Sequence, residues 1–370
     1  MDLTEFLLAW RTAPLPDRQV IDALVHPTHA GPSVELARAL AHWPGTYYWS
    51  DELDGRHLVL TRPARPRRRE AWGLHVLLFA ATLLTTTYAG AVLAGALPAN
   101  PFGFFVHVAS WDSGFVRALA RGLVFSLPLL TILLCHELGH YLTARRYGLD
   151  VSPPYFIPVP LIPSFIGTMG AFIRLRTVLS DRRQLLDVGA AGPLAGFAVA
   201  LPALAIGLAH SQLLAPGDVG REGGMVLWFG GTPVTLGDSL ITIVTRLLVT
   251  GQLAPVALHP LAFAGWVGMF VTMLNLLPIA QLDGGHILYA ALPRWHQRVA
   301  LVFWVLIVCL GWFWRGWLVW GLLVLMLSRG RLGHPPVLDA YRPLPRSRSG
   351  LTWGSLALFL ATFTPVPFPI

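Results

Sequence analysis

The chain has 370 residues, of which 54% are hydrophobic and only 12% are charged, and its mean hydropathy is +0.59. An ordinary soluble domain has fewer apolar and more charged residues, so this composition predicts a polytopic membrane protein. All 27 basic residues are arginine, and the net charge is +8. The arginines gather in short clusters beside apolar runs, which indicates membrane topology rather than nucleic-acid binding. Cys135 and Cys309 lie inside apolar runs, so neither a disulfide framework nor a cysteine zinc site is expected.

Residues 1–70 have the composition of a small soluble region and do not have the pattern of a secretory signal peptide. Aromatic residues at 47–49, the turn-forming pair Asp54 and Gly55, and the run 57–61 predict a small β-hairpin within it. An arginine cluster closes the region, and we interpret it as a cytoplasmic anchor in preference to a binding site. The cluster consists of Arg62, Arg65, Arg67, Arg68 and Arg69.

The first apolar run, residues 71–97, is long enough to cross a hydrocarbon core of about 30 Å at about 1.5 Å per residue. With the arginine cluster inside, the chain emerges on the other face, and residues 100–117 are predicted to be an external loop. A second span, residues 118–147, then returns to the cytoplasm. Arg145 and Arg146 at its end agree with that direction.

The second span carries the most informative stretch of the chain, H-E-L-G-H at residues 136–140. On a helix, His136 and His140 lie one turn apart on the same face, so both imidazoles can bind one metal ion while Glu137 stands beside it. Zinc with three protein ligands keeps a position for water, lowers the pKa of that water to roughly 7, and lets a carboxylate take its proton. A buried histidine pair bonded to neighbouring backbone is the simpler alternative, although ionisable residues in a span are costly and usually functional.

Residues 149–181 contain too many prolines for a helix, namely Pro153, Pro154, Pro158, Pro160 and Pro163. A glycine-rich stretch, 167–170, then leads into an extended-looking segment at 171–175. Extended backbone at membrane depth needs shelter from protein or a water-filled cavity. Its edge could hold a substrate as an added strand, and a plain connecting loop fits the sequence equally well.

The third span, residues 185–208, begins with small residues that let helices approach closely. These are Gly189, Gly192, Pro193 and Gly196. The mixed region 210–259 contains G-D-S-L at 237–240, which resembles a serine hydrolase motif but has no partner histidine arrangement. We interpret Asp238 or Ser239 as the N-cap of an apolar segment that ends near Thr250.

The fourth span, residues 261–277, leads into N-L-L-P-I-A-Q-L-D-G-G-H at 275–286. Because this span also runs toward the cytoplasm, Asp283 is expected at the depth of the two histidines, where it would complete a zinc site with an open position. Asn275 could donate a hydrogen bond to a developing oxyanion, and a polar contact between helices is the comparable alternative. His286 is a less favoured metal ligand.

Residues 297–327 are predicted to form two short spans broken near 311–316, with the tryptophans as interface anchors. A basic linker follows, and a last apolar segment, 351–363, is short for a span. The linker contains Arg329, Arg331, Arg342, Arg346 and Arg348. The predicted fold is thus an all-α polytopic membrane protein with six or seven transmembrane helices, a re-entrant β-hairpin near the site and a small soluble N-terminal region.

Four segments together resemble the site-2 protease family of intramembrane zinc metalloproteases: 136–140, G-T-M-G-A-F at 167–172, A-G-P-L-A-G at 191–196, and 275–286. The resemblance covers about residues 121–292 and is nearest to the branch without a PDZ domain that includes chloroplast EGY-type proteins and bacterial relatives. It implies zinc ligands His136, His140 and Asp283, with Glu137 as catalytic base, in a helical membrane core with a hairpin beside the site. Many relatives have asparagine where this chain has Gly196.

The sequence therefore predicts a zinc-dependent intramembrane endopeptidase that cuts a membrane protein in or near a transmembrane segment. One zinc per chain is expected, with Glu137 and Asn275 as the catalytic candidates. A membrane metal transporter and a catalytically silent relative that binds membrane proteins are the alternatives. A silent relative has no need of a base between its ligands, so Glu137 argues against it.

The predicted units are a cytoplasmic region 1–70, the first span and external loop 71–117, a catalytic core 118–292, and C-terminal spans with a basic linker 293–370. We expect a multi-pass protein of a bacterial inner membrane, in contact with the lipid bilayer and a transmembrane substrate. No nucleic-acid partner is expected, and no sequence feature specifies the oligomeric state.

Overall fold

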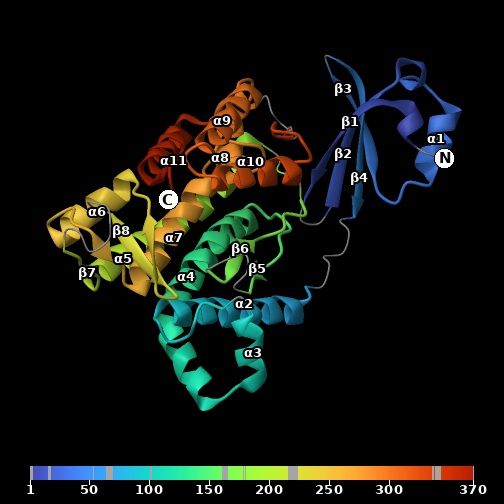
Figure 1. Ribbon diagram of the computed structural model, residues 1–370. Helices are drawn as coiled ribbons and strands as arrows, with labels where there is room; N and C mark the ends of the chain where they lie inside the picture. Colours follow the sequence, from blue (N-terminus) through green and yellow to red (C-terminus); the bar gives the residue numbers. More distant parts are fainter. Residues whose placement is uncertain are drawn as a thin grey trace.

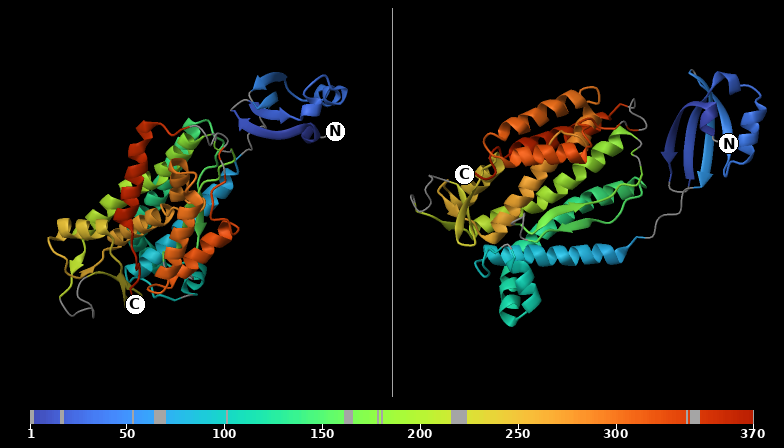
Figure 2. Two further views of the ribbon diagram at one scale, coloured as in Figure 1. Left: turned by 90° about the horizontal axis from the view of Figure 1, so that it is seen from above. Right: turned by 45° about the vertical axis from the view of Figure 1, so that its right-hand side comes forward.

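The computed structural model describes residues 3–15, 18–52, 54–63, 70–100, 102–160, 166–177, 179, 181–215, 224–335, 337 and 343–369. Four members of the first arginine cluster, Arg65, Arg67, Arg68 and Arg69, lie outside these ranges, as do Pro163 and Arg342. The molecule consists of an N-terminal domain and a larger helical body (Figure 1). In both views of Figure 2 the N-terminal domain stands apart from that body.

The N-terminal domain is built on an antiparallel sheet, so the prediction of an all-α protein is wrong for this part of the chain. The sheet has the strand order β1-β2-β4-β3. The predicted hairpin is confirmed: Tyr48 of β3 lies opposite Val59 of β4. Helix α1 (Val34–Ala41) covers the sheet and buries Leu36 and Leu40 against Leu58. The strands are β1 (Leu7–Pro14), β2 (Arg18–Val25), β3 (Tyr47–Glu52) and β4 (Gly55–Pro63), with 3-10 helices Leu3–Phe6 and Pro27–His29.

Three helices of the body are long and apolar enough to cross a membrane, among the described residues. They are α2 (Trp72–Leu93), α4 (Ser113–Arg146) and α5 (Arg182–Ala209). They match the first three predicted spans. The predicted fourth span is a shorter helix, because the turn and Pro278 that follow Asn275 end it before it reaches about 20 residues. The other helices are α3 (Gly103–Ser110), α6 (Leu240–Thr250), α7 (Pro260–Asn275), α8 (Asp283–Ala291), α9 (His296–Leu310), α10 (Gly316–Leu327) and α11 (Ser349–Thr362).

Two predicted connections are partly different in the structure. Residues 100–117 do not form a simple loop, since they include α3 and the first residues of α4, whose N-terminus is capped by the Asp112 carboxylate. The predicted break near 311–316 is confirmed, because it separates α9 from α10.

The proline-rich region contains a two-stranded antiparallel sheet, one strand of which overlaps the predicted extended segment. Strand β5 (Tyr155–Pro158) pairs with β6 (Thr168–Phe172), and a bridge between Val151 and Leu175 continues the pairing. The regular strand thus begins three residues earlier than the predicted extended segment. A second small sheet was not predicted; it consists of β7 (Gln212–Leu213), β8 (Met225–Phe229), β9 (Thr232–Leu236) and β10 (Val256–Ala257).

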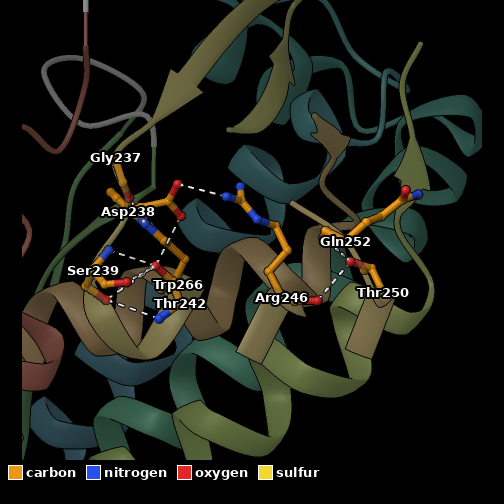
Figure 3. A network of polar contacts seen from close by, with 8 residues as sticks. All are labelled: Gly237, Asp238, Ser239, Thr242, Arg246, Thr250, Gln252 and Trp266. Atoms are coloured by element: carbon orange, nitrogen blue, oxygen red, sulfur yellow. Dashed lines mark hydrogen bonds and ion pairs between the residues drawn. The ribbon is translucent and has the colours of Figure 1, made fainter. Parts of the chain in front are cut away.

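The G-D-S-L segment is the start of α6 and has a structural role (Figure 3). Ser239 and Thr242 form a reciprocal capping box, which satisfies backbone donors at the helix N-terminus. Asp238 pairs with the buried Arg246 at 3.1 Å, and the indole of Trp266 donates to the Gly237 carbonyl. These contacts favour the capping interpretation, because the Ser239 hydroxyl accepts the Thr242 N–H in the cap.

Helices α4, α5 and α7 pack against one another in the centre of the body, and α2 packs on α4 (Figures 1 and 2). Phe125 of α4 stacks on Phe263 of α7 with ring centroids 5.4 Å apart, and both side chains are fully buried. Ala200 and Leu204 of α5 belong to the same core. This packing holds the C-terminal ends of α4 and α7, which the sequence predicts on the cytoplasmic side, close together.

Candidate metal centre

Helix α4 presents His136, Glu137 and His140 as its sequence spacing predicted. The three residues are 4%, 7% and 7% exposed, and the two imidazole rings lie 4.9 Å apart, centroid to centroid. Burial of three ionisable groups in an apolar helix is costly unless they find partners. The site must therefore supply those partners from other elements.

Asp283 is the principal partner, and α8 begins at this residue. Its Oδ2 lies 3.3 Å from Nε2 of His136 and 3.3 Å from Nε2 of His140, and the two Nε2 atoms are 3.2 Å apart. Ligand atoms bound to one tetrahedral zinc at about 2.0–2.1 Å are about 3.3–3.4 Å from one another. The triangle of donor atoms thus has the size of one face of a zinc tetrahedron.

The hydrogen bond on the far side of His140 fixes which nitrogen faces Asp283. Nδ1 of His140 lies 2.7 Å from the carbonyl oxygen of Val188. A carbonyl can only accept, so Nδ1 carries a proton, and in the neutral ring the lone pair of Nε2 would face His136 and Asp283. Metal-bound histidines are oriented in this manner by a second hydrogen bond. The donor set therefore fits a divalent cation better than an ordinary hydrogen-bonded cluster.

Small residues of α5 form the surface on which the two histidines rest. A Cβ atom on Gly192 would lie 2.0 Å from Nε2 of His140, and one on Gly196 would lie 3.1 Å from Nδ1 of His136. On the α4 side, a Cβ on Gly139 would lie 2.4 Å from the Ala191 carbonyl oxygen. The sequence predicted close helix approach here, and the structure adds that the glycines also make room for the imidazoles.

Asn275 is brought to the same site by the end of α7. Its Nδ2 lies 3.2 Å from Nε2 of His136. His286, one turn after Asp283, points its Nδ1 to Nε2 of His334 at 2.7 Å. It does not belong to the group of converging donors, which agrees with its lower rank as a ligand.

Glu137 borders two cavities. The larger cavity has a volume of about 380 Å³ and a largely apolar wall that includes Leu133, Trp266 and Phe270. The smaller cavity has a volume of about 240 Å³ and is lined by His136, His140 and Asp283. The backbone N–H of Ile173, just after β6, faces the Glu137 carboxylate, and both residues line the smaller cavity. The Ile173 N–H and the Val188 carbonyl are backbone groups that every such residue carries, so the sequence could not identify them as parts of the site.

A comparison with protein families gives a match to Peptidase family M50 over residues 124–310, a range that contains the histidines, Glu137, Asn275 and Asp283. The chain belongs to peptidase family M50. The family match covers half of the chain and confirms the resemblance drawn from the four sequence segments.

Curated relatives of this chain include plant chloroplast proteins. The probable zinc metalloprotease EGY1 of Arabidopsis thaliana is 36% identical over 251 residues, which cover 65% of this chain and 43% of the relative. The EGY1 protein of Oryza sativa subsp. japonica is 35% identical over 169 residues (45% and 27%), and Arabidopsis EGY2 is 31% identical over 263 residues (69% and 43%). The chain thus spans less than half the length of these relatives. No solved structure gives a significant match.

Proposed function

We propose that this M50 protein is a zinc-dependent intramembrane endopeptidase that hydrolyses a peptide bond in or near a transmembrane segment of a membrane protein. The observation that carries the proposal is the convergence of His136, His140 and Asp283 beside Glu137 within a body of membrane-length helices. The family match and the relatives named as probable zinc metalloproteases support it.

The residues divide the chemistry among them. Zinc held by His136, His140 and Asp283 would polarise the scissile carbonyl and acidify a water molecule. Glu137 would take the proton from that water during attack and deliver it to the leaving amine. Asn275, whose side-chain amide lies at the same centre, would donate a hydrogen bond to the developing oxyanion.

An apolar, extended polypeptide is the substrate that the site accommodates best. The larger cavity beside Glu137 is lined mainly by apolar side chains, and β6, which reaches the site, is paired only with β5 among the described strands. A substrate strand could therefore add to β6 and place its scissile bond next to Glu137. A helical substrate must unwind first, because its amides are bonded internally.

We further propose that the β5-β6 hairpin is re-entrant, that six or seven segments interact with the bilayer, and that the N-terminal domain is cytoplasmic in a bacterial inner membrane. Arg145 and Arg146 at the end of α4 support this orientation. Protease protection of inverted and right-side-out vesicles tests it, since the N-terminal domain should be digested only where the cytoplasmic face is exposed.

Glu137→Gln tests the catalytic proposal. The variant keeps the shape and the metal ligands but cannot accept a proton, so it should retain zinc and lose cleavage of a model transmembrane substrate in proteoliposomes. Glu35→Gln on the exposed face of α1 is the matched control and should cleave normally. Full cleavage by Glu137→Gln would remove Glu137 from its role, and zinc flux that survives this substitution would favour a transporter.

A further inference from the structure

The chain continues past β6 as an extended segment, residues 173–176, that forms one wall of the site. Ile173 and Leu175 line the cavity that Glu137 and the metal-ligand candidates also line, and the Ile173 N–H faces the Glu137 carboxylate. On its other edge the segment pairs with residues 150–152, with Ser152 N–H donating to Arg174 O at 3.1 Å and Arg176 N–H donating to Asp150 O at 2.9 Å. Residues 173–176 therefore run from the cavity wall beside Glu137 to Arg176, so the contacts of the Arg176 side chain bear on the position of that wall.

Arg176 is held by Glu70, which lies just before α2. Both guanidinium Nη atoms donate to the two carboxylate oxygens, with Nη2 at 3.0 Å from Oε2, and Asp150 lies 3.6 Å from Nη1. The side chains of Arg176 and Glu70 are only 20% and 19% exposed. A bidentate, charge-assisted pair of this kind is stronger and more directional than an exposed ion pair.

His75 of α2 connects Glu70 to Pro154, the residue before β5. Nε2 of His75 lies 3.7 Å from the Glu70 carboxylate, and Nδ1 of His75 donates to the Pro154 carbonyl at 3.0 Å. Hydrogen bonding to Arg176 holds the pKa of Glu70 below its usual value, so the carboxylate is charged at neutral pH. Residues at the start of α2 thus contact both parts of the small sheet: Glu70 holds Arg176, which follows β6, and His75 bonds to Pro154, which precedes β5.

We infer that Arg176, through Glu70, is a positioning residue for the proposed protease site: the pair fixes residues 173–176, and with them the cavity wall that Ile173 and Leu175 form beside Glu137. The inference rests on the proposed function for its rate effect. The Glu137 carboxylate must stay within hydrogen-bond reach of the water it activates, and an error of about 1 Å can lower a rate by about 100-fold. Glu70 is also where the chain arriving from the N-terminal domain meets the body, so the pair links that junction to the site.

The test uses three variants: Arg176→Gln, Glu70→Gln, and the double variant that carries both substitutions. The control is Arg174→Gln. Arg174 lies on the same segment, its side chain is exposed, and no ion pair to it is found among the described residues. Each full-length protein is purified and assayed for zinc content, kcat and KM on a model transmembrane substrate, and hydrogen–deuterium exchange of peptides that contain residues 171–176.

We expect both single variants to keep zinc, to lose about 10-fold or more in kcat, and to exchange the 171–176 amides about 10-fold faster. The double variant should lose no more than either single variant, because one broken pair is the whole effect. Arg174→Gln should match the wild type. Arg176→Lys, which keeps the charge but not the bidentate fork, should fall between wild type and Arg176→Gln.

Wild-type kcat and exchange in Arg176→Gln would overturn the inference, as would equal losses in Arg174→Gln or fully additive losses in the double variant. If a glutamine variant does not fold, Arg176→Lys decides the question by the same readouts. If the wild type shows no cleavage at all, the proposed function has failed, and the exchange data alone then decide whether the pair positions the segment.

Discussion

Gly192 offers the sharpest test of the metal centre, because the structure leaves no room for a side chain there. A Cβ at this position would lie 2.0, 2.4 and 2.5 Å from Nε2, Cδ2 and Cε1 of His140. Favourable contacts between such atoms are about 3.5 Å or longer, so alanine requires a displacement of about 1.5 Å. The Val188 carbonyl resists movement of the ring, and the contact of Gly139 with Ala191 resists separation of α4 from α5.

We expect Gly192→Ala to displace His140 from the other two donors. Overpacking of this kind costs about 1–3 kcal/mol, and the free energy of unfolding should fall by that amount. Removal of one of three ligands should weaken zinc binding by about 100-fold or more, since second-shell changes alone typically cost 10- to 100-fold. The assay is zinc per chain and the melting temperature of the detergent-purified protein.

Gly354→Ala is the matched control for this substitution. Gly354 lies inside α11, and a Cβ there would meet no heavy atom within 4 Å. Alanine is preferred to glycine within a helix by about 0.5–1 kcal/mol, so the control should melt at the same or a higher temperature and keep its zinc. If Gly192→Ala binds one zinc per chain with wild-type affinity, the assignment of His140 as a zinc ligand packed against Gly192 is refuted.

Three further predictions concern single groups. Asp283→Ala and His140→Ala should each abolish the single zinc measured by elemental analysis, and normal binding by Asp283→Ala would refute the three-ligand centre. Asn275→Ala should keep zinc and lower kcat by about 100- to 1,000-fold; a change in melting temperature alone would assign Asn275 to a helix contact. Burial opposes protonation of His57, but its hydrogen bonds to Asp22 and Asp54 outweigh this and raise its pKa above 6.5. The stabilisation of the N-terminal domain by protonated His57 is therefore complete below that ordinary value and is lost as the pH rises through the raised pKa. Histidine hydrogen–deuterium exchange should show this elevated pKa and its decrease in Asp22→Asn; an unchanged pKa would contradict the assigned cause.

Much of the helical body could be predicted from the sequence. Long apolar runs have few alternatives in a bilayer, so α2, α4 and α5 were found close to their observed bounds. The N-terminal sheet was predicted only as one hairpin, because the strands β1 and β2 contain mixed polar and apolar residues and their pairing depends on contacts distant in sequence. Helix α4 begins at Ser113 and not at the predicted residue 118, because the Asp112 carboxylate caps it there, and the strand beside the site begins at Thr168 and not at 171.

The sequence by itself determined the local half of the site. The four-residue spacing of His136 and His140 places them on one helical face whatever the rest of the chain does, and Glu137 follows from the same geometry. Asp283 was expected at the same depth from the direction of its span, but only the tertiary structure gave the distances that close the donor triangle and the Val188 carbonyl that accepts from Nδ1 of His140. It also decided that Ile173, with its backbone amide facing Glu137, shares the wall of the smaller cavity with that residue. Every residue carries the same backbone donor and acceptor, so the position of such a group in the folded chain, and not its identity, makes it functional.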